Sequence, residues 1–132
     1  GYIRFEPRGQ YIGTEPYNKW TKPSCVLIGE DNYSDACGFP YVYKTLGIGK
    51  LIGAPVPGTM TAVWWENQID PSIVFGIPQV GALGVKEGRY LENMQIEPDI
   101  LVYNDPASVL RGEDRQLEAA VKEMLKTIDS NK

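Results

Sequence analysis

The chain has 132 residues, of which 42% are hydrophobic and 23% charged, values that fit one globular domain and exclude wholesale disorder. Its 13 basic and 17 acidic residues give a net charge of −4, which argues against a nucleic-acid-binding surface and a polybasic membrane anchor. The sequence contains no histidine, so a Ser-His-Asp, Cys-His or histidine-zinc site cannot be complete within these residues. We expect a single domain over residues 1–132.

The N-terminal third predicts one strand and one helix. Residues 1–22 show no sustained periodicity and predict a lead-in loop, with at most a short edge strand at Tyr2–Phe5. Ser24–Ile28 is apolar on both faces and ends at a glycine, which predicts a strand in a sheet covered on both sides. After a polar turn, Ser34–Leu46 has helical spacing. Pro40 within it is expected to delete one backbone hydrogen bond and kink the helix, unless it falls in the first turn.

The middle of the chain has strong β propensity. Leu51–Ile52 predicts a short strand, and the proline-containing stretch 53–58 predicts a loop. Thr61–Trp65 predicts a strand whose adjacent tryptophans point to opposite faces, so one ring is expected to line a groove or a partner surface. Ile73–Val80 continues this character, and a glycine and a proline within it indicate a bulge or a sheet edge.

The C-terminal third contains the clearest element. Asp99–Tyr103 predicts a strand, and Asp105–Pro106 has the N-cap and first-position proline of a short helix through Leu110. Six apolar residues then fall on one helical stripe, with Glu113 and Asp114 at its positive N-terminal end. This stripe predicts a packing helix without chemistry. Its members are Leu117, Ala120, Val121, Met124, Leu125 and Ile128.

Three short patterns are better explained without a ligand. Gly47–Lys50 resembles part of a dinucleotide-binding loop, but the third glycine is at position 53, where the motif needs it at 52. A helix-ending turn explains these glycines better. Asn32–Ser34 fits the glycosylation pattern, which arises often by chance. The carboxylates Glu30, Asp31 and Asp35 favour a solvated turn over a metal cage, so no metal site is predicted.

Ser34 opens the helix that follows a buried strand, at the carboxyl edge of the sheet where open α/β folds place their sites. Its hydroxyl is expected to be exposed, and the backbone N–H of Asp35 to point at the same spot, ready to stabilise an oxyanion. Serine is also a favoured N-cap, and local chemistry alone favours that plain capping role. The turn is not the nucleophile elbow of the α/β-hydrolases, since Asn32 and Ala36 replace the glycines needed there.

Six segments follow one another in order: Leu27–Ala36, Gly47–Gly53, Pro57–Thr59, Tyr90–Asn93, Glu97–Ile100 and Gly112–Ala120. Together, over about residues 23–126, they resemble the catalytic core of the tail-specific, or C-terminal-processing, serine peptidases, specifically the tricorn-like branch. The resemblance implies an α/β, layered strand-helix fold of the ClpP and crotonase-like type, with a mixed sheet and a C-terminal packing helix. It makes residues 23–132 the C-terminal part of a catalytic domain.

The resemblance also implies site roles. It makes Ser34 the nucleophile and the Asp35 backbone N–H one oxyanion donor, and it matches Glu92 to the acid that orients a histidine through an intervening serine. Judged by its own context, Glu92 is a solvated carboxylate in a loop. The resemblance also implies that the general base, a histidine, and a second oxyanion donor lie upstream of residue 1. Thr59 follows Gly58 where the other branch of the family has its lysine base, which favours the tricorn-like branch.

These observations predict a serine endopeptidase that hydrolyses a peptide or protein substrate through an acyl-enzyme on Ser34, with no metal or organic cofactor. Because the base is expected in an upstream part of the same polypeptide, the isolated chain is expected to be inactive. The sequence shows no transmembrane-length apolar run. The resemblance allows a homo-oligomer and a parent exported to the periplasm or cell envelope, and the compartment and any pairing of Cys25 with Cys37 stay open.

Two other functions are compatible with the residues. In the first, Ser34 is only a cap, and the Trp64/Trp65 face makes the same fold a non-catalytic module that binds a peptide or a protein. The second is a crotonase-like acyl-CoA enzyme, against which stands the lack of a basic cluster suited to the CoA phosphates. A histidine and a glycine-rich strand-turn upstream of residue 1 would favour the peptidase.

Overall fold

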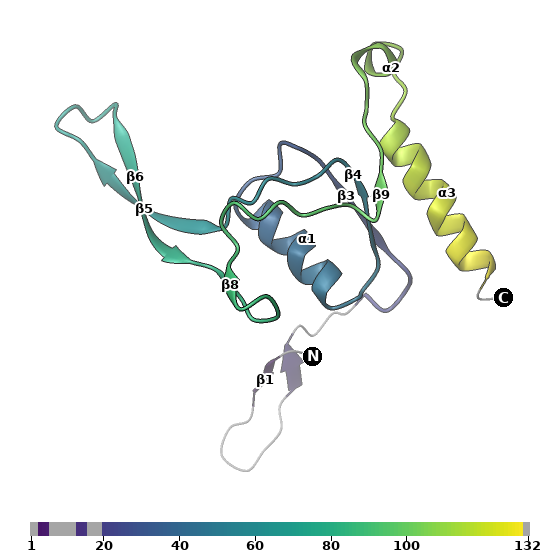
Figure 1. Ribbon diagram of the computed structural model, residues 1–132, viewed down its shortest axis with the longest axis horizontal. Coiled ribbons are helices and arrows are strands. Elements are labelled where there is room, and N and C mark those ends of the chain that lie inside the picture. Colours follow the sequence, from purple (N-terminus) through teal and green to yellow (C-terminus); the bar gives the residue numbers. More distant parts are fainter. Residues whose placement is uncertain (1–2, 6–12, 16–19, 131–132) are drawn as a thin grey trace.

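The computed structural model describes residues 3–5, 13–15 and 20–130, with side chains from residue 20 onward (Figure 1). Its central feature is a three-stranded sheet in the order β3–β4–β9, and separate pairs join β1 to β2, β5 to β6 and β7 to β8. The predicted α/β class and C-terminal helix are confirmed. The elements are β1 (Ile3–Phe5), β2 (Gly13–Glu15), β3 (Cys25–Ile28), α1 (Asp35–Thr45), β4 (Lys50–Gly53), β5 (Thr61–Asn67), β6 (Val74–Gly81), β7 (Leu83–Gly84), β8 (Arg89–Tyr90), β9 (Ile100–Leu101), α2 (Pro106–Leu110) and α3 (Arg115–Asp129).

The central sheet is parallel, because α1 carries the chain back from the end of β3 to the start of β4. β3 pairs with β4 from Cys25 opposite Lys50 to Ile28 opposite Gly53, and β4 pairs with β9 at Ile52 opposite Ile100. Three hairpins and an isolated bridge between Val56 and Ile96 are antiparallel. Since parallel strands end at one edge, the segments that follow β3 and β4 leave the sheet close together.

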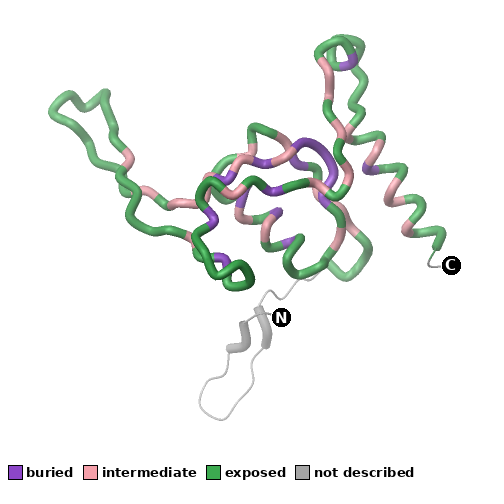
Figure 2. The backbone as a smooth tube through the Cα atoms, in the orientation of Figure 1, coloured by how far each residue is buried: buried purple, intermediate pink, exposed green. Residues whose placement is uncertain are grey.

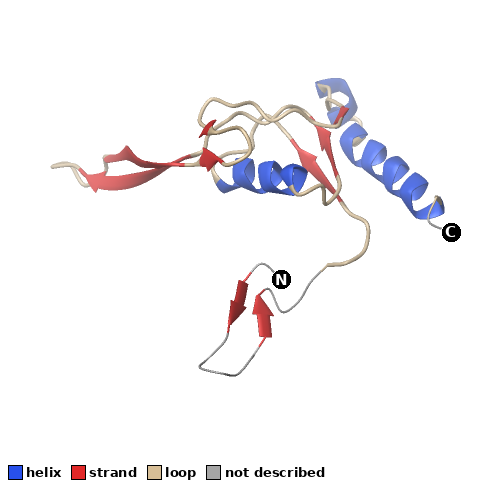
Figure 3. Cartoon of the chain, turned by 60° about the horizontal axis from the view of Figure 1, so that its bottom comes forward, coloured by secondary structure: helices blue, strands red, loops and turns tan. Residues whose placement is uncertain are grey.

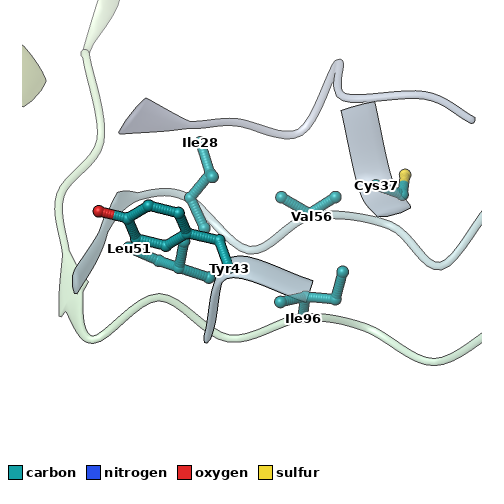
Figure 4. Close-up of a cluster of buried hydrophobic side chains, with 6 residues drawn as sticks. All are labelled: Ile28, Cys37, Tyr43, Leu51, Val56 and Ile96. Carbon is teal, nitrogen blue, oxygen red and sulfur yellow. The ribbon is translucent and has the colours of Figure 1, made fainter. Parts of the chain in front are cut away.

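Helices cover both faces of β3. Ile28 belongs to the core cluster with Tyr43 of α1, and Val26 packs against that cluster. Cys25 and Leu27, the alternate residues of the strand, line a groove with α3. The predicted two-sided covering of this strand is therefore confirmed. The core cluster, drawn in Figure 4, consists of Ile28, Cys37, Tyr43, Leu51, Val56 and Ile96.

α1 continues through Pro40, which is fully buried. Because proline has no N–H, the Ala36 carbonyl loses the acceptor role that a regular helix would give it at this position. The Asn32 side chain takes that place, since its Nδ2 donates to the Ala36 oxygen at 2.8 Å. The helix ends as predicted, with Leu46 as its C-cap and Gly47 in the left-handed region at φ 63°.

The β5–β6 hairpin extends away from the sheet and is exposed along most of its length (Figures 1 and 2). Its register shifts between Ala62 and Val63, opposite the stretch that contains Pro78, where an irregularity was predicted. Trp64 and Trp65 point to opposite faces and are 58% and 64% exposed. Both rings, rather than one, are thus available at the surface of the described chain.

Several short strands were not predicted. β2, β7 and β8 are two or three residues long, and β9 is shorter than the predicted Asp99–Tyr103. The lead-in prediction for residues 1–22 lies mostly outside the described residues, and within them β1 pairs with β2 as a hairpin. α2 and α3 have the predicted bounds to within a few residues, and Asp105 and Asp114 are their N-caps. Ala120 of α3 is buried, while Leu117 on the same stripe is half exposed.

The helices lie beside the sheet in Figure 3, with α1 and α3 as the two long ones. Among the described residues, no helix combines the length and apolar character needed to cross a bilayer. In the same part of the chain, no three carboxylate or thiol side chains gather closely enough to hold a metal ion.

Gly53→Ala should destabilise the protein far more than Gly47→Ala. Gly53 has a φ of 136°, and a Cβ there would lie 2.0 Å from the Ile28 carbonyl oxygen, whereas Gly47 at φ 63° faces open space. We expect a loss of roughly 2 to 5 kcal/mol at Gly53, from strain plus overpacking, and about 1 kcal/mol at Gly47. Urea unfolding measures both, and equal losses would show that the close approach of β3 and β4 is relaxed in solution.

Candidate active site

Ser34 occupies a strained turn between β3 and α1. Its φ of 54° and ψ of −117° lie in a region that residues other than glycine rarely adopt. Holding a serine there costs roughly 1 to 3 kcal/mol, so the surrounding structure has to impose it. The residue is exposed, so the turn presents Ser34 to the solvent at the carboxyl edge of the sheet.

Ser34 does not act as a hydrogen-bonding cap in this structure. It precedes the first residue of α1, but its side chain accepts no hydrogen bond from the helix N-terminus. Asp105 and Asp114, by contrast, accept from the backbone N–H groups of Ser108 and Leu117 at their own helices. Local chemistry alone favoured a capping role for Ser34, and the geometry does not supply it.

The side chain of Asn32 makes two hydrogen bonds to the backbone on either side of Ser34. Its Oδ1 accepts from the Gly29 N–H at 3.1 Å, and its Nδ2 donates to the Ala36 carbonyl that Pro40 leaves without its usual partner. One amide side chain therefore joins the end of β3 to the first turn of α1. The sequence signal for this role is the preference of asparagine for turns in which its side chain bonds nearby backbone groups.

Thr59 binds the backbone of the turn, and Cys37 contacts Thr59. The Ser34 N–H donates to Thr59 Oγ1 at 3.2 Å, and the same oxygen lies 3.1 Å from Cys37 Sγ. The Cys37 sulfur also lies 2.9 Å from the carbonyl oxygen of Pro57. Cys37 is fully buried and belongs to the core cluster, so the support of Ser34 is continuous with the hydrophobic core.

Glu92 contacts the same segment further along the chain. Its Oε2 accepts from the Met60 N–H at 2.7 Å and from the Thr61 hydroxyl at 2.8 Å. These two hydrogen bonds, the one from Thr61 first, lower the pKa of the Glu92 carboxyl below its ordinary value and keep it ionised near neutral pH. The next residue, Asn93, has a φ of 60° and donates its N–H to the Gly58 oxygen at 2.7 Å.

The Asp35 N–H lies at the N-terminus of α1, where backbone N–H groups have no partner within the helix. The N–H groups of Cys37 and Gly38 both donate to the Ser34 carbonyl, while the Asp35 N–H has no acceptor among the described residues. It is therefore open to an anionic ligand at the positive end of α1.

The structure brings the predicted site residues together only in part. Ser34 and Asp35 share one turn, and Glu92 reaches that turn through the segment Thr59–Thr61 rather than by direct contact. The supporting roles of Asn32 and Thr59 were not predicted. These roles depend on three-dimensional contacts that no local sequence pattern predicts.

Comparison with known proteins places this geometry in a family. Residues 3–102 match the family model of Peptidase family S41. A protein of Chlamydia pneumoniae is 34% identical over 90 residues, which are 67% of this chain and 14% of that protein. The tricorn protease of Thermoplasma acidophilum is 25% identical over 122 residues, 92% of this chain and 11% of its own length. The chain thus spans a seventh or less of the length of these curated relatives.

Solved structures give the same result for the fold. The crystal structure of the tricorn protease has a TM-score of 0.76 at 24% identity and covers 96% of this chain and 12% of the tricorn chain. Mature CPAF has a TM-score of 0.58 at 27% identity and covers 67% of this chain and 17% of the CPAF chain. The layered strand-helix arrangement is therefore shared with both proteins.

Thr61→Val should raise the pKa of the Glu92 carboxyl. It removes the hydrogen bond from Thr61, which lowers this pKa more than the one from Met60 does. A lowered pKa adds stability above the unfolded-state pKa, and this stability is lost as the pH falls through the folded value. In Thr61→Val the contribution should be smaller and its loss should be complete at a higher pH, because the folded pKa lies closer to the unfolded one, whereas Thr61→Ser keeps the hydroxyl and the wild-type behaviour. Carboxyl NMR titration measures both variants, and an unchanged Glu92 pKa in Thr61→Val would contradict the assignment.

Proposed function

This chain belongs to peptidase family S41, and from that premise we propose that it carries the nucleophile of a serine endopeptidase. Ser34 attacks the scissile peptide bond, the Asp35 N–H receives the oxyanion, and Glu92 supports the general base. Residues 23–132 form part of the catalytic domain, and a peptide or protein is the substrate. The observation that carries the proposal is the strained, exposed Ser34 turn without a capping hydrogen bond.

The strain at Ser34 favours a nucleophile over a structural residue. A serine that served only as a cap would gain its hydrogen bond in an ordinary extended conformation, as Asp105 does at φ −79°. Strained backbone persists where the surrounding structure imposes it, and such positions cluster at active sites. A sharp strand-to-helix turn is also the geometry that exposes a serine hydroxyl for attack in other hydrolase folds.

The reaction follows from this arrangement. Ser34 Oγ forms a bond to the substrate carbonyl carbon, its proton passes to the general base, and the carbonyl oxygen gains the charge that the Asp35 N–H stabilises. The base then returns the proton to the leaving amine, the peptide C–N bond breaks, and water hydrolyses the acyl-enzyme. The chain has no histidine, and we assign the base to a histidine in an upstream segment of the same polypeptide.

The ionised Glu92 carboxylate fits a role behind the base. The hydrogen bonds from Met60 and Thr61 both end on Oε2 of the carboxylate, and Glu92 is exposed. A fixed negative charge can orient a histidine, through an intervening serine, and stabilise its protonated form.

A second candidate function rests on the β5–β6 hairpin. Trp64 and Trp65 are 58% and 64% exposed on opposite faces, and large aromatic side chains of this kind anchor protein and peptide partners. In that case Ser34 has no chemical role. Reaction of Ser34 with an active-site probe distinguishes the two functions.

A fluorophosphonate probe should label the full-length protein at Ser34, because a serine activated by a base attacks the phosphorus as it would a carbonyl carbon. The 132-residue chain alone should not react, since an unassisted hydroxyl is a weak nucleophile at neutral pH. Mass spectrometry of the labelled peptide locates the site. Labelling of the full-length protein that persists in Ser34→Ala would remove Ser34 from the nucleophile role.

Glu92→Gln in the full-length protein should lower kcat by roughly 10-fold to 1000-fold and leave KM nearly unchanged. The amide oxygen can still accept from Met60 and Thr61, so the substitution removes the charge and keeps the shape. Steady-state kinetics on a peptide substrate measures the effect, with Glu97→Gln as a control at a neighbouring exposed carboxylate. A wild-type kcat in Glu92→Gln would place Glu92 outside the site.

A further inference from the structure

We propose that Thr59 is a positioning residue for the nucleophile, an inference that rests on the proposed role of Ser34. Thr59 Oγ1 accepts the Ser34 N–H at 3.2 Å, across 25 residues of sequence. Ser34 is one of two residues other than glycine with positive φ in the described part of the chain. The Thr59 hydroxyl therefore binds the backbone of Ser34 at the point where its conformation is least favourable.

The hydroxyl of Thr59 is itself oriented. Its oxygen accepts from Ser34, and its hydrogen can be donated to Cys37 Sγ, 3.1 Å away. The Cys37 thiol in turn lies 2.9 Å from the Pro57 carbonyl oxygen and 3.2 Å from that of Asn32, and can donate its hydrogen to either. Because Cys37 is fully buried on α1, this chain of contacts fixes Thr59 against the helix that begins at the nucleophile.

The hydrogen bond from Ser34 to Thr59 also limits which N–H groups can donate to the oxyanion. In some serine hydrolases the N–H of the nucleophile itself is one of the donors. Here the Ser34 N–H is engaged by Thr59, whereas the next N–H along the chain, that of Asp35, has no acceptor among the described residues. Thr59 thus holds Ser34 in place and leaves the oxyanion to Asp35.

The same segment connects the nucleophile to Glu92. The residue that follows Thr59 donates its N–H to the Glu92 carboxylate, and the residue that precedes it accepts from Asn93, the other strained position. A displacement of Thr59 would therefore disturb both the Ser34 turn and the loop that holds Glu92 and Asn93. A Cβ at Gly58 would lie 2.3 Å from the Met94 nitrogen, so the backbone of this segment packs closely against the chain that follows Glu92.

The test compares Thr59→Val with Thr59→Ser in the full-length protein. Valine removes the hydroxyl at nearly the same volume, and serine keeps it. We expect the second-order rate of fluorophosphonate labelling at Ser34, and kcat, to fall about 10-fold to 100-fold in Thr59→Val. KM should stay near the wild-type value, and Thr59→Ser should recover most of the rate.

Thr127→Val is the matched control, because it removes a threonine hydroxyl that bonds the Glu123 carbonyl on α3, away from the turn. It should label at the wild-type rate even if its melting temperature falls. Amide hydrogen exchange of Ser34 provides a readout independent of catalysis, and it should accelerate in Thr59→Val and in Thr59→Ala but not in Thr59→Ser.

The outcomes separate the two hypotheses. Wild-type labelling in a folded Thr59→Val protein, or unchanged Ser34 exchange, overturns the role of Thr59 while the nucleophile stands. Absence of labelling in the wild-type full-length protein overturns the proposed function, and Ser34 exchange in the variants still decides whether Thr59 holds the turn. If Thr59→Val fails to fold, a rate in Thr59→Ser below that of Thr127→Val overturns the proposal as well.

Discussion

The candidate site depends on one segment, Pro57–Thr61, that lies between two strained turns. The Ser34 N–H donates to the Thr59 hydroxyl, and the Asn93 N–H donates to the Gly58 oxygen. Both residues with positive φ therefore donate to this segment, at adjacent positions. Each hydrogen bond contributes only about 1 kcal/mol in general, comparable to the strain of a single such residue. The turns are therefore held jointly, and the loss of this segment would release both.

The parallel sheet explains why this segment reaches Ser34. β3 and β4 end at the same edge, so the chain that leaves β4 passes beside the turn that leaves β3. The passage requires the close approach at Gly53, whose conformation no side chain would tolerate. The bridge between Val56 and Ile96 then pairs this chain with the segment after Glu92. The topology thus brings the Thr59 hydroxyl to the Ser34 N–H, and the next two residues, Met60 and Thr61, to the Glu92 carboxylate.

The sequence predicts the parts of the fold that have a period or a cap. β3, α1, β4 and α3 are found because an apolar run, a helical stripe or a terminal glycine marks each of them. β7 and β8 are missed because two residues carry no period. Pro40 is predicted to delete one backbone hydrogen bond of α1 and kink it, and the structure adds that the carbonyl left free accepts from Asn32, which joins helix to turn. Such a relation depends on a three-dimensional contact, as does the role of Thr59.

The support of the Ser34 turn and the packing of the core share one residue, Cys37. Cys37 is fully buried, lies in the core cluster with Val56 and Ile96, and contacts the Thr59 hydroxyl that accepts the Ser34 N–H. A change in core packing near Cys37 would be transmitted to Ser34 through Thr59, with both side chains still in place. The strain at Ser34 is thus sustained by the hydrophobic core directly beneath it, and a close-packed interior transmits rather than absorbs such displacements.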